Sequence, residues 1–318
     1  MRCLVTGVAG FIGSHLAEAL LKAGYQITGI DCFTEYYSKE LKKANLANLR
    51  QNRNFNFVEA DLLHLDLKSI LKKIDWVFHL SAQAGVRASW GKNFEIYIQN
   101  NILATQKLLE ASKNVKLKGF VYASSSSVYG DTNTLPTPEE VYLQPVSPYG
   151  LTKLAGEHLC YLYHKNFDVP TVALRYFTVY GPRQRPDMAF HRFLKAALLG
   201  EPIEIYGDGE QTRDFTYISD IINVHLTVMD HFHPGEVFNI GGGTQTSLKT
   251  ALALISEITG HEIKIIYKSR QKGDVRHTAA DITKAKNILG YKPQVGLSDG
   301  LEAEWKWIQT TYKKLRRL

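Results

Sequence analysis

Tyr149 and Lys153 stand four residues apart in a segment typical of a helix that begins near Ser147-Pro148. On a helix this spacing puts both side chains on one face. A free phenol has a pKa near 10 and is a poor base at neutral pH, but a neighbouring ammonium group stabilises the phenolate. The pair therefore predicts that Tyr149 is a general base whose pKa Lys153 lowers.

Four consecutive serines, Ser124 to Ser127, follow a short apolar run typical of a strand. In open α/β sheets, ligands bind at the carboxyl ends of the parallel strands. A hydroxyl at that position can relay a proton. At least one of the four is expected to cap the backbone of the turn instead.

A glycine-rich turn, Gly7-Val8-Ala9-Gly10-Phe11-Ile12-Gly13, separates the first strand-like run from the first helical stretch. In this context Gly7 makes the tight turn, Gly10 lets the backbone approach a pyrophosphate, and Gly13 lets helix and strand pack closely. The helix N-terminus adds free N–H groups and a positive dipole. The turn predicts a dinucleotide-binding site.

Two carboxylates end strand-like runs near that turn. Asp31 follows Gly13 by 18 residues, where it can accept both ribose hydroxyls and would repel a 2'-phosphate, which favours NAD over NADP. Asp61 follows the third run. It either reaches the adenine amine or caps a helix that begins at Leu62.

Short apolar runs alternate with amphipathic helical stretches through the first half of the chain, which is typical of a parallel sheet covered by helices. Helical spacing predicts helices over residues 11–22, 93–112 and 149–165. The apolar runs predict six strands: residues 2–6, 26–31, 55–59, 76–80, 119–124 and 171–176. The fold class is α/β, with a doubly wound parallel Rossmann sheet and a smaller C-terminal α/β substrate lobe.

The rhythm changes after Tyr176 to a loop rich in Gly, Pro and Arg and then to shorter elements. We expect an NAD-binding Rossmann domain over residues 1–176 and a substrate lobe over 177–318. The two are expected to be interleaved, with part of 215–242 returning to the Rossmann domain.

Lys and Arg outnumber Asp and Glu by 38 to 31, a net charge of +7. The densest basic runs, Lys39–Lys43 and Lys313–Arg317, are typical of solvated helix faces, and no aromatic-basic recognition module lies between them. The excess charge therefore suits a small anionic ligand better than nucleic acid. No apolar stretch approaches the roughly 18 residues of a membrane span. The first residues lack the features of a signal peptide, so we expect a cytoplasmic protein.

Further motifs join these in a recognisable order. They are His79-Leu-Ser-Ala82, Asn101 to Thr105, Ser124 to Gly130, Ser147-Pro-Tyr-Gly-Leu-Thr-Lys153, Ile205 to Phe215, and Gly273-Asp-Val275 with Ala280-Asp281. Nearly the whole chain resembles the extended short-chain dehydrogenase/reductase family, and within it the NAD-dependent nucleotide-sugar epimerases and dehydratases.

The resemblance implies specific roles. Tyr149 is the base, Lys153 holds the nicotinamide ribose, and Ser125 shares the proton of the sugar 4-hydroxyl. A hydride leaves sugar C4 for NAD while Tyr149 removes the hydroxyl proton, which gives a 4-keto sugar. The family resemblance also implies a homodimer, formed through the helices at 93–112 and 149–165.

Ser126 and Ser127 distinguish the subfamilies. Dehydratases that resemble this chain carry Asp-Glu at these two positions, and UDP-glucuronate decarboxylases carry Glu at the position of Ser127. The serines therefore indicate 4-epimerisation.

The segment from Arg175 to Phe190, with Thr178 where many family members have Asn, and the segment Gln83 to Trp90 resemble most the bacterial UDP-glucuronate 4-epimerases. A guanidinium fork suits a planar carboxylate, and Arg185 lies in the loop expected to face it. Arg87 is a second candidate, and either arginine can instead be an ordinary surface residue.

The expected substrate is thus UDP-glucuronate, converted to UDP-galacturonate. Because the 4-keto form is a β-keto acid, we expect Thr178, Ser127 and Arg185 to hold its carboxylate and so suppress loss of carbon dioxide. The alternatives are a UDP-glucose or UDP-N-acetylglucosamine 4-epimerase, a UDP-glucuronate decarboxylase, and an inactive NAD-binding scaffold.

The remaining contacts follow from the resemblance alone. Tyr206 is expected near the uracil, and Gln211, Arg213 and Arg276 near the diphosphate. No metal site is expected, and His225, His231 and His233 are interpreted as helix-surface residues. The other expected cofactor contacts are Phe11, Ile12, Phe33, Leu62, Leu80, Ala82, Gln83, Asn101 and Tyr176.

Overall fold

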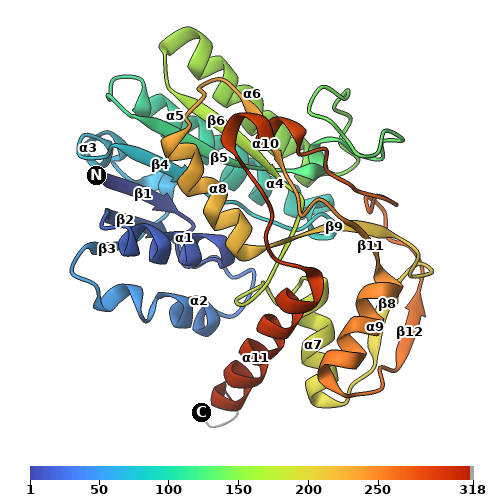
Figure 1. Cartoon of the computed structure of the whole chain (residues 1–318). Helices are drawn as coiled ribbons and strands as arrows, with labels where there is room; N and C mark the ends of the chain where they lie inside the picture. The colour runs from blue at the N-terminus through green and yellow to red at the C-terminus, as the bar shows by residue number, and fades with distance from the viewer. Residues whose placement is uncertain (316–318) are drawn as a thin grey trace.

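Seven parallel strands form the central sheet of the computed structural model, which describes residues 1–315 (Figure 1). Their order is β10-β6-β5-β4-β1-β2-β3, so the order reverses between β1 (Arg2–Thr6) and β4 (Trp76–His79). Such a reversal opens a crevice at the carboxyl ends of the strands. The predicted doubly wound parallel sheet is confirmed.

The remaining strands of this sheet bury apolar side chains on both faces, as strands covered by helices on each side must, except the edge strand β3, whose apolar side chains are only partly buried. They are β2 (Gln26–Asp31), β3 (Phe55–Glu59), β5 (Gly119–Ser125), β6 (Thr171–Tyr176) and β10 (Val237–Ile240). Compared with the prediction, β4 is one residue shorter and β5 one residue longer.

Helices cover both faces of the sheet (Figure 1). On one face α1 (Phe11–Lys22) packs against α8 (Ile218–Asp230). On the other face α6 (Pro148–Phe167) packs against α5 (Ala104–Ser112), which in turn packs against α3 (Leu67–Leu71). Two apolar cores result, one under each helical layer.

The predicted helix over 93–112 is not a single α-helix. It consists of α4 (Phe94–Tyr97), a π-helical stretch η5 (Ile98–Leu103) and α5. A π turn takes about five residues per hydrogen-bonded turn instead of four, so it changes which side chains face a given direction.

A second lobe has its own apolar core, to which Phe193, Leu252 and Trp305 contribute. Its elements are β7 (Thr178–Tyr180), α7 (Ala189–Leu199), β8 (Ile203–Tyr206), β9 (Thr212–Tyr217), β11 (Gln245–Ser247), α9 (Leu248–Thr259), β12 (Ile265–Lys268) and α11 (Leu297–Leu315).

The chain passes between the two parts more than once. After β9 it returns to supply α8 and β10, which pairs with β6 at the edge of the large sheet, and α10 (Thr283–Leu289) then contacts β10. The expected division at residue 176 stays a prediction, and residues 316–318 of the expected second lobe lie outside the described residues.

The remaining helical segments are short: α2 (Lys39–Leu46), η1 (Leu49–Gln51), η2 (Leu62–His64), η3 (Arg87–Ser89), η4 (Gly91–Asn93) and η6 (Ser126–Val128).

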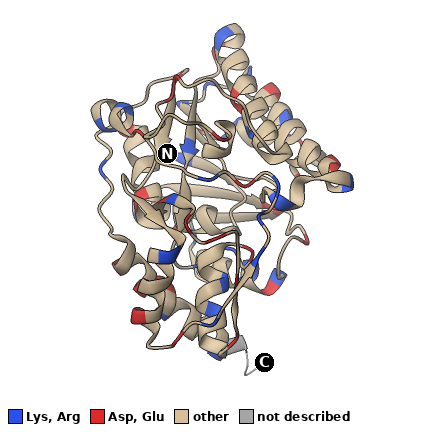
Figure 2. Ribbon diagram, turned by 90° about the vertical axis from the view of Figure 1, so that its right-hand side faces the viewer, with Lys and Arg blue, Asp and Glu red and all other residues tan. Residues whose placement is uncertain are grey.

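Charged residues of both signs are interspersed over the elements (Figure 2). Between residues 1 and 315 no helix is both long enough and apolar enough to span a membrane.

Candidate active site

A cleft lies at the carboxyl ends of the central strands. Of the predicted cofactor-contacting residues, fourteen line it: Gly7, Gly10, Phe11, Ile12, Gly13, Asp31, Asp61, Leu62, Leu80, Ala82, Gln83, Tyr149, Lys153 and Tyr176. Arg185 of the predicted substrate site also lines it.

The glycine turn forms one wall of the cleft. A Cβ on Gly13 would collide with the Gly7 carbonyl oxygen, so strand β1 and helix α1 can approach this closely only with glycine here. The side-chain amide of Asn45 donates to the Ala9 carbonyl at 3.0 Å and fixes the turn from α2. Helix α1 begins after Gly10 with no side-chain cap, which leaves its first N–H groups to bind an anion.

Asp31 ends β2 beside this turn. Its two carboxylate oxygens accept from the backbone N–H groups of Ala9, at 3.0 Å, and Phe33, at 2.8 Å. Burial raises the pKa of Asp31 even though these hydrogen bonds act in the opposite direction. Phe33 itself has a left-handed backbone (φ 51°) and is buried without lining the cleft.

Of the two predicted roles of Asp61, contact with the adenine amine or a helix cap, its side chain makes the cap contact in the structure. It accepts from the Leu63 N–H at 2.9 Å at the start of η2, although the residue also borders the cleft. The cap fixes the Asp61 carboxylate at this edge of the cleft.

Asn101, predicted as a cofactor contact, does not line the cleft. Its side chain accepts from the Gln83 N–H at 2.7 Å and donates to the Gln83 carbonyl and the Thr152 hydroxyl. Asn100 borders the cleft instead, because the π-helical stretch η5 shifts the side-chain register by comparison with a regular helix. Asn101 therefore anchors the Gln83 segment.

Several residues of the cleft were missed by the sequence analysis, and they come from the segment after β2. Lys42, expected on a solvated helix face, is buried and donates to the Thr34 carbonyl at 2.5 Å. The sequence signal that could have identified this segment is the pair Tyr36-Tyr37, a few residues after Asp31, the predicted ribose-binding carboxylate. The missed cleft residues in this segment include Thr34, Tyr36, Tyr37 and Lys42.

Tyr149 lies in the first turn of α6. Ser147 caps this helix by accepting from the Gly150 N–H at 3.1 Å, and Pro148 fits its first turn. Burial raises the pKa of the Tyr149 phenol, whereas Arg185 and a side-chain hydrogen bond with Ser125 lower it. The positive charge that acts on this phenol is thus Arg185.

Lys153 lines the same cleft one turn along α6, as the spacing predicted. Its ammonium donates to the Ala123 carbonyl at 2.8 Å and is almost fully buried. Burial lowers the pKa of Lys153 to about 8, and the nearby Glu157 opposes that shift.

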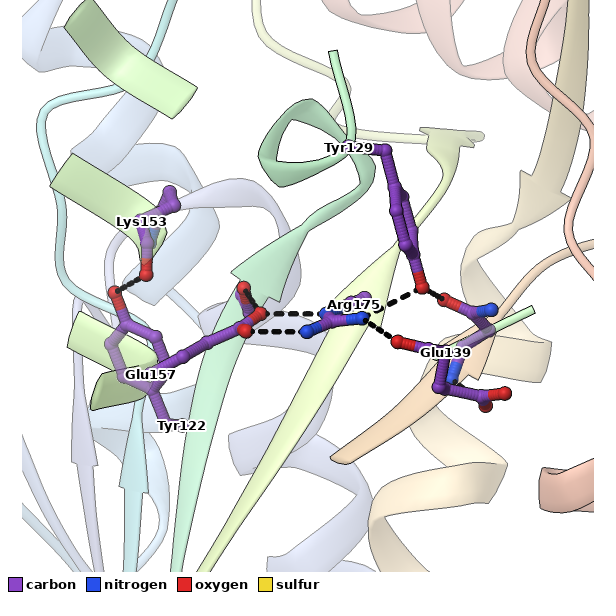
Figure 3. A network of polar contacts seen from close by, with 8 residues as sticks. Tyr122, Tyr129, Glu139, Lys153, Glu157 and Arg175 are labelled. Atoms are coloured by element: carbon purple, nitrogen blue, oxygen red, sulfur yellow. Dashed lines mark hydrogen bonds and ion pairs between the residues drawn. The ribbon is translucent and has the colours of Figure 1, made fainter. Parts of the chain in front are cut away.

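Glu157 lies one turn beyond Lys153 and forms a buried ion pair with Arg175 of β6 (Figure 3). Both carboxylate oxygens accept from the guanidinium, at 2.9 and 2.8 Å, and Ser124 of β5 also donates to Glu157. Arg175 continues to the Tyr129 hydroxyl at 2.8 Å, which donates to Asn239 of β10. This network fastens α6 to three strands of the sheet.

The predicted hydroxyl groups lie at the end of β5. Ser125 accepts from the Ser127 N–H at 3.2 Å and donates to the Ser127 hydroxyl at 3.1 Å, so it caps η6 as one of the four serines was expected to do. Ser126 is partly exposed beside it, and Thr178 is partly exposed in β7, opposite Phe215 of β9.

Arg185 forms a two-bond contact with Asp187, from Nε to Oδ1 at 3.0 Å and from Nη2 to Oδ2 at 2.9 Å. Its side chain is 23% exposed. Arg185 is therefore a cleft residue and not an ordinary surface arginine.

The other predicted substrate contacts gather at the second lobe. Arg87 pairs with Asp274 at 2.6 Å, and its guanidinium lies 4.2 Å from the centre of the Tyr206 ring. Arg213 donates to backbone carbonyls of 275–276, and Arg276 pairs with Asp208 at 2.8 Å.

Two buried oxygens near these positions have no hydrogen-bond partner among the described residues: the Ser81 hydroxyl in the cleft and Oε1 of Gln211. A buried polar group without a partner is costly, so both suit a bound polar ligand.

Within residues 1–315, no group of three or more His, Cys, Asp and Glu side chains is arranged to hold a metal ion. The interpretation of His225 as a surface residue is wrong. Its ring is fully buried, its Nε2 lies 2.8 Å from the Tyr176 hydroxyl, and burial lowers its pKa to about 4.

Comparison with known proteins places these features in context. Residues 3–241 match the model of the NAD dependent epimerase/dehydratase family. An uncharacterised UDP-glucose epimerase of Bacillus subtilis is 47% identical over 98% of this chain and 99% of its own length. A UDP-glucuronate 4-epimerase of Thermodesulfobacterium geofontis is 38% identical over 99% of this chain and 98% of its own.

Among solved structures, a UDP-glucuronic acid 4-epimerase of Bacillus cereus in complex with UDP-glucuronic acid and NAD is similar throughout. It is 50% identical, covers 98% of this chain with 100% of its own, and has a TM-score of 0.96.

Proposed function

This chain belongs to the NAD dependent epimerase/dehydratase family, and we propose that it is an NAD-dependent UDP-glucuronate 4-epimerase that interconverts UDP-glucuronate and UDP-galacturonate. The observation that carries the choice of sugar is Arg185. A guanidinium in the same cleft as Tyr149, close enough to lower its pKa, suits a substrate that carries a carboxylate beside the reacting carbon.

The cleft fits NAD. The glycine turn and the uncapped start of α1 suit a pyrophosphate, Asp31 suits a ribose, and the unpartnered Ser81 hydroxyl offers a further polar contact. When bound, NAD supplies a hydride acceptor that takes hydrogen from sugar C4 and returns it to either face.

Tyr149 takes the proton from the sugar 4-hydroxyl and gives it back, and Ser125, which lowers the pKa of the phenol, shares that proton. Lys153 keeps a positive charge beside the nicotinamide ribose. Ser126 and Ser127 have no carboxyl group that could act as an acid or a base. The keto sugar is therefore reduced again and not dehydrated.

Arg185, Thr178 and Ser127 hold the substrate carboxylate. A 4-keto uronate loses carbon dioxide most readily when its carboxylate turns perpendicular to the ketone plane. Hydrogen bonds that restrict this rotation therefore suppress decarboxylation. We expect replacement of Arg185 by His or Ala to abolish epimerisation or to release pentose.

The uridine diphosphate lies against the second lobe in this proposal. Tyr206 contacts the uracil, and Gln211, Arg213 and Arg276 lie near the diphosphate. Arg87 stacks on Tyr206 and pairs with Asp274, which suits a residue at the entrance better than one that binds the carboxylate.

A neutral-sugar 4-epimerase is the second candidate, because the Bacillus subtilis relative is described as a UDP-glucose epimerase. In that case Arg185 would pair with Asp187 only to stabilise its loop.

We further propose that the protein works as a cytoplasmic homodimer. Exposed apolar side chains on neighbouring helical segments support a paired surface: Ile96, Leu103, Leu151 and Leu162.

An NMR time course of the purified protein with UDP-glucuronate, UDP-glucose and UDP-N-acetylglucosamine in separate tubes, with and without added NAD, tests the proposed substrate. UDP-galacturonate without pentose is the expected product. Turnover of the neutral sugars alone would contradict the role of Arg185. Accumulation of UDP-xylose or a 4-keto pentose would contradict the interpretation of Ser126 and Ser127.

A further inference from the structure

Asp187 contacts only one edge of the Arg185 guanidinium. The two hydrogen bonds, at 3.0 and 2.9 Å, use Nε and Nη2, which together form the side-on edge of the group. Among residues 1–315, the structure gives Nη1 of Arg185 no hydrogen-bond partner. Because a guanidinium carries five N–H donors in a rigid plane, its end-on edge remains able to bind a second carboxylate.

Tyr36 holds Asp187 from a different part of the chain. Its hydroxyl donates to Oδ2 of Asp187 at 3.1 Å, and the Arg185 guanidinium lies 5.9 Å from the centre of its ring. Gly85 makes room for this contact. A Cβ there would collide with the Tyr36 hydroxyl, and its backbone has φ +102°, which an L side chain rarely adopts. Three loops, after β2, after β4 and after β7, therefore meet at one aspartate-arginine pair.

The charges of the pair suit this arrangement. Burial alone would raise the pKa of Asp187, but the adjacent Arg185 lowers it below its ordinary value, so the carboxylate stays ionised at neutral pH. Burial raises the pKa of Tyr36, as does Asp187, so its hydroxyl stays a donor. Three residues act on the charge of Arg185: Asp187 of its own loop, Tyr36 of the loop after β2, and Tyr149 of α6.

We propose that Asp187, supported by Tyr36, is a positioning residue that fixes the side-on edge of Arg185 so that the end-on edge presents its donors to the substrate carboxylate. This inference rests on the proposed function. It adds that the preference for a uronate over a neutral sugar depends on a residue that need not touch the substrate. A preformed pair loses less side-chain freedom when the ligand binds than a lone arginine would.

Asp187→Asn tests the proposal with little change of shape. The amide offers one acceptor oxygen in place of two and loses the charge. The affinities of NAD-loaded protein for UDP-glucuronate and UDP-glucose are measured by titration calorimetry in a Tyr149→Phe background, which blocks turnover. We expect the dissociation constant for UDP-glucuronate to rise about tenfold or more, and that for UDP-glucose to change less than about twofold.

A second readout uses the active enzyme. The fraction of product that appears as pentose is expected to increase in Asp187→Asn, since a looser arginine restrains the substrate carboxylate less. Tyr36→Phe removes one hydrogen bond to Asp187 and is expected to act in the same direction with a smaller change.

Glu18→Gln is the matched control. Glu18 pairs at 2.8 Å with Arg183, two residues before Arg185 in the same loop, without contacting Arg185 or Asp187. It is expected to leave the ratio of the two affinities unchanged. An equal loss in this variant would mean that any loosening of the loop suffices, and the positioning role would be overturned.

Unchanged or tighter binding of UDP-glucuronate by Asp187→Asn would also overturn the inference, because Asp187 would then be idle or a competitor for Arg185. If protein with Asp187 intact shows no preference for UDP-glucuronate over UDP-glucose, the proposed function fails and the inference with it. If the preference is present and survives in Asp187→Asn, only the inference fails.

Discussion

At the scale of single residues, the proposed reaction depends on a phenol, Tyr149, that burial makes a weaker acid. Desolvation raises the pKa of Tyr149, and the groups that oppose it are Arg185 and Ser125. The phenol therefore takes up and returns a proton only because charge and hydrogen bonds are already arranged around it.

Replacement of Tyr149 by Phe removes the proton acceptor and leaves the ring in place. We expect kcat to fall by about 10²- to 10⁴-fold, the usual contribution of a general base, with NAD affinity little changed. The rate of UDP-galacturonate formation by NMR and a fluorescence titration with NAD measure the two quantities. Tyr161→Phe, the same change at an exposed position of α6, is the control, and comparable losses in both variants would contradict the assignment.

Residue spacing predicted which side chains share the cleft, but not that an arginine from a distant loop acts on the Tyr149 phenol. Tyr149 and Lys153 line the same cleft as predicted, yet the Lys153 ammonium donates to the Ala123 carbonyl and Arg185 acts on the phenol. Arg185 follows Tyr149 by 36 residues, and no local pattern gives their distance. Asp187 and Tyr36 were missed for the same reason, since their contact joins separate loops.

At the scale of secondary-structure elements, the apolar pattern of the sequence predicted the bounds of regular elements correctly. The boundaries of β1, β2, β3 and β6 agree with the prediction to the residue. It failed in the helical segment after β4, where the π-helical stretch put Asn100 at the cleft and turned the amide of Asn101 onto Gln83. Periodicity of 3.6 residues cannot detect such an irregularity, because tertiary contacts stabilise it.

Helix α6 carries the proposed catalytic pair, Tyr149 and Lys153, and the Glu157–Arg175 ion pair holds it against the sheet (Figure 3). Burial lowers the pKa of Lys153 to about 8. Glu157 and Cys160, both on the same helix, act in the opposite direction and raise it. Burial lowers the pKa of His79, and Lys153 adds to that shift. We therefore expect activity that needs the ammonium to be present below about pH 8 and to decline above it.

Glu157→Gln removes the contribution that raises the Lys153 pKa. The ammonium then loses its proton at lower pH, so we expect the alkaline decline of kcat/KM to move down by roughly one pH unit. The variant also leaves Arg175 without its ion-pair partner, which should cost about 3–5 kcal/mol of stability. The pH profile of kcat/KM and a thermal melt measure the two effects.

Glu139→Gln is the control for this variant, because Glu139 contacts Asn239 and its carbonyl accepts from Arg175 without approaching Lys153. The alkaline decline of kcat/KM in Glu139→Gln should match that of the wild type. A Glu157→Gln enzyme with an unshifted limb would show that Lys153 does not set the decline.

At the scale of the whole molecule, α6 has two faces with different tasks. Tyr149 and Lys153 face the cleft, whereas Leu151 and Leu162 are 49% and 50% exposed. Leu151 and Lys153 lie about 200° apart around the helix at 100° per residue, and Leu151 and Leu162 lie within about 20° of one another. One helix thus carries the chemistry on one side and an apolar stripe on the other.

The neighbouring helical segment extends that stripe. Ile96 and Leu103 are exposed and seven residues apart, and α4, η5 and α5 all pack against α6. A second copy of the chain that covers this surface would bury apolar side chains from both segments, and it would restrain the helix that holds Tyr149.

The double variant Leu151→Glu and Leu162→Glu places two like charges on each side of such a two-fold interface. We expect sedimentation velocity to give a particle of twice the chain mass for the wild type and of one chain for the variant. Because α6 loses its support, kcat should fall while the isolated chain keeps its far-ultraviolet circular dichroism. Ile266→Glu, on the exposed β12 of the second lobe, should leave both mass and kcat unchanged. A double variant that keeps the wild-type mass would mean that the stripe serves another partner or none, and that α6 is held by the Glu157 network alone.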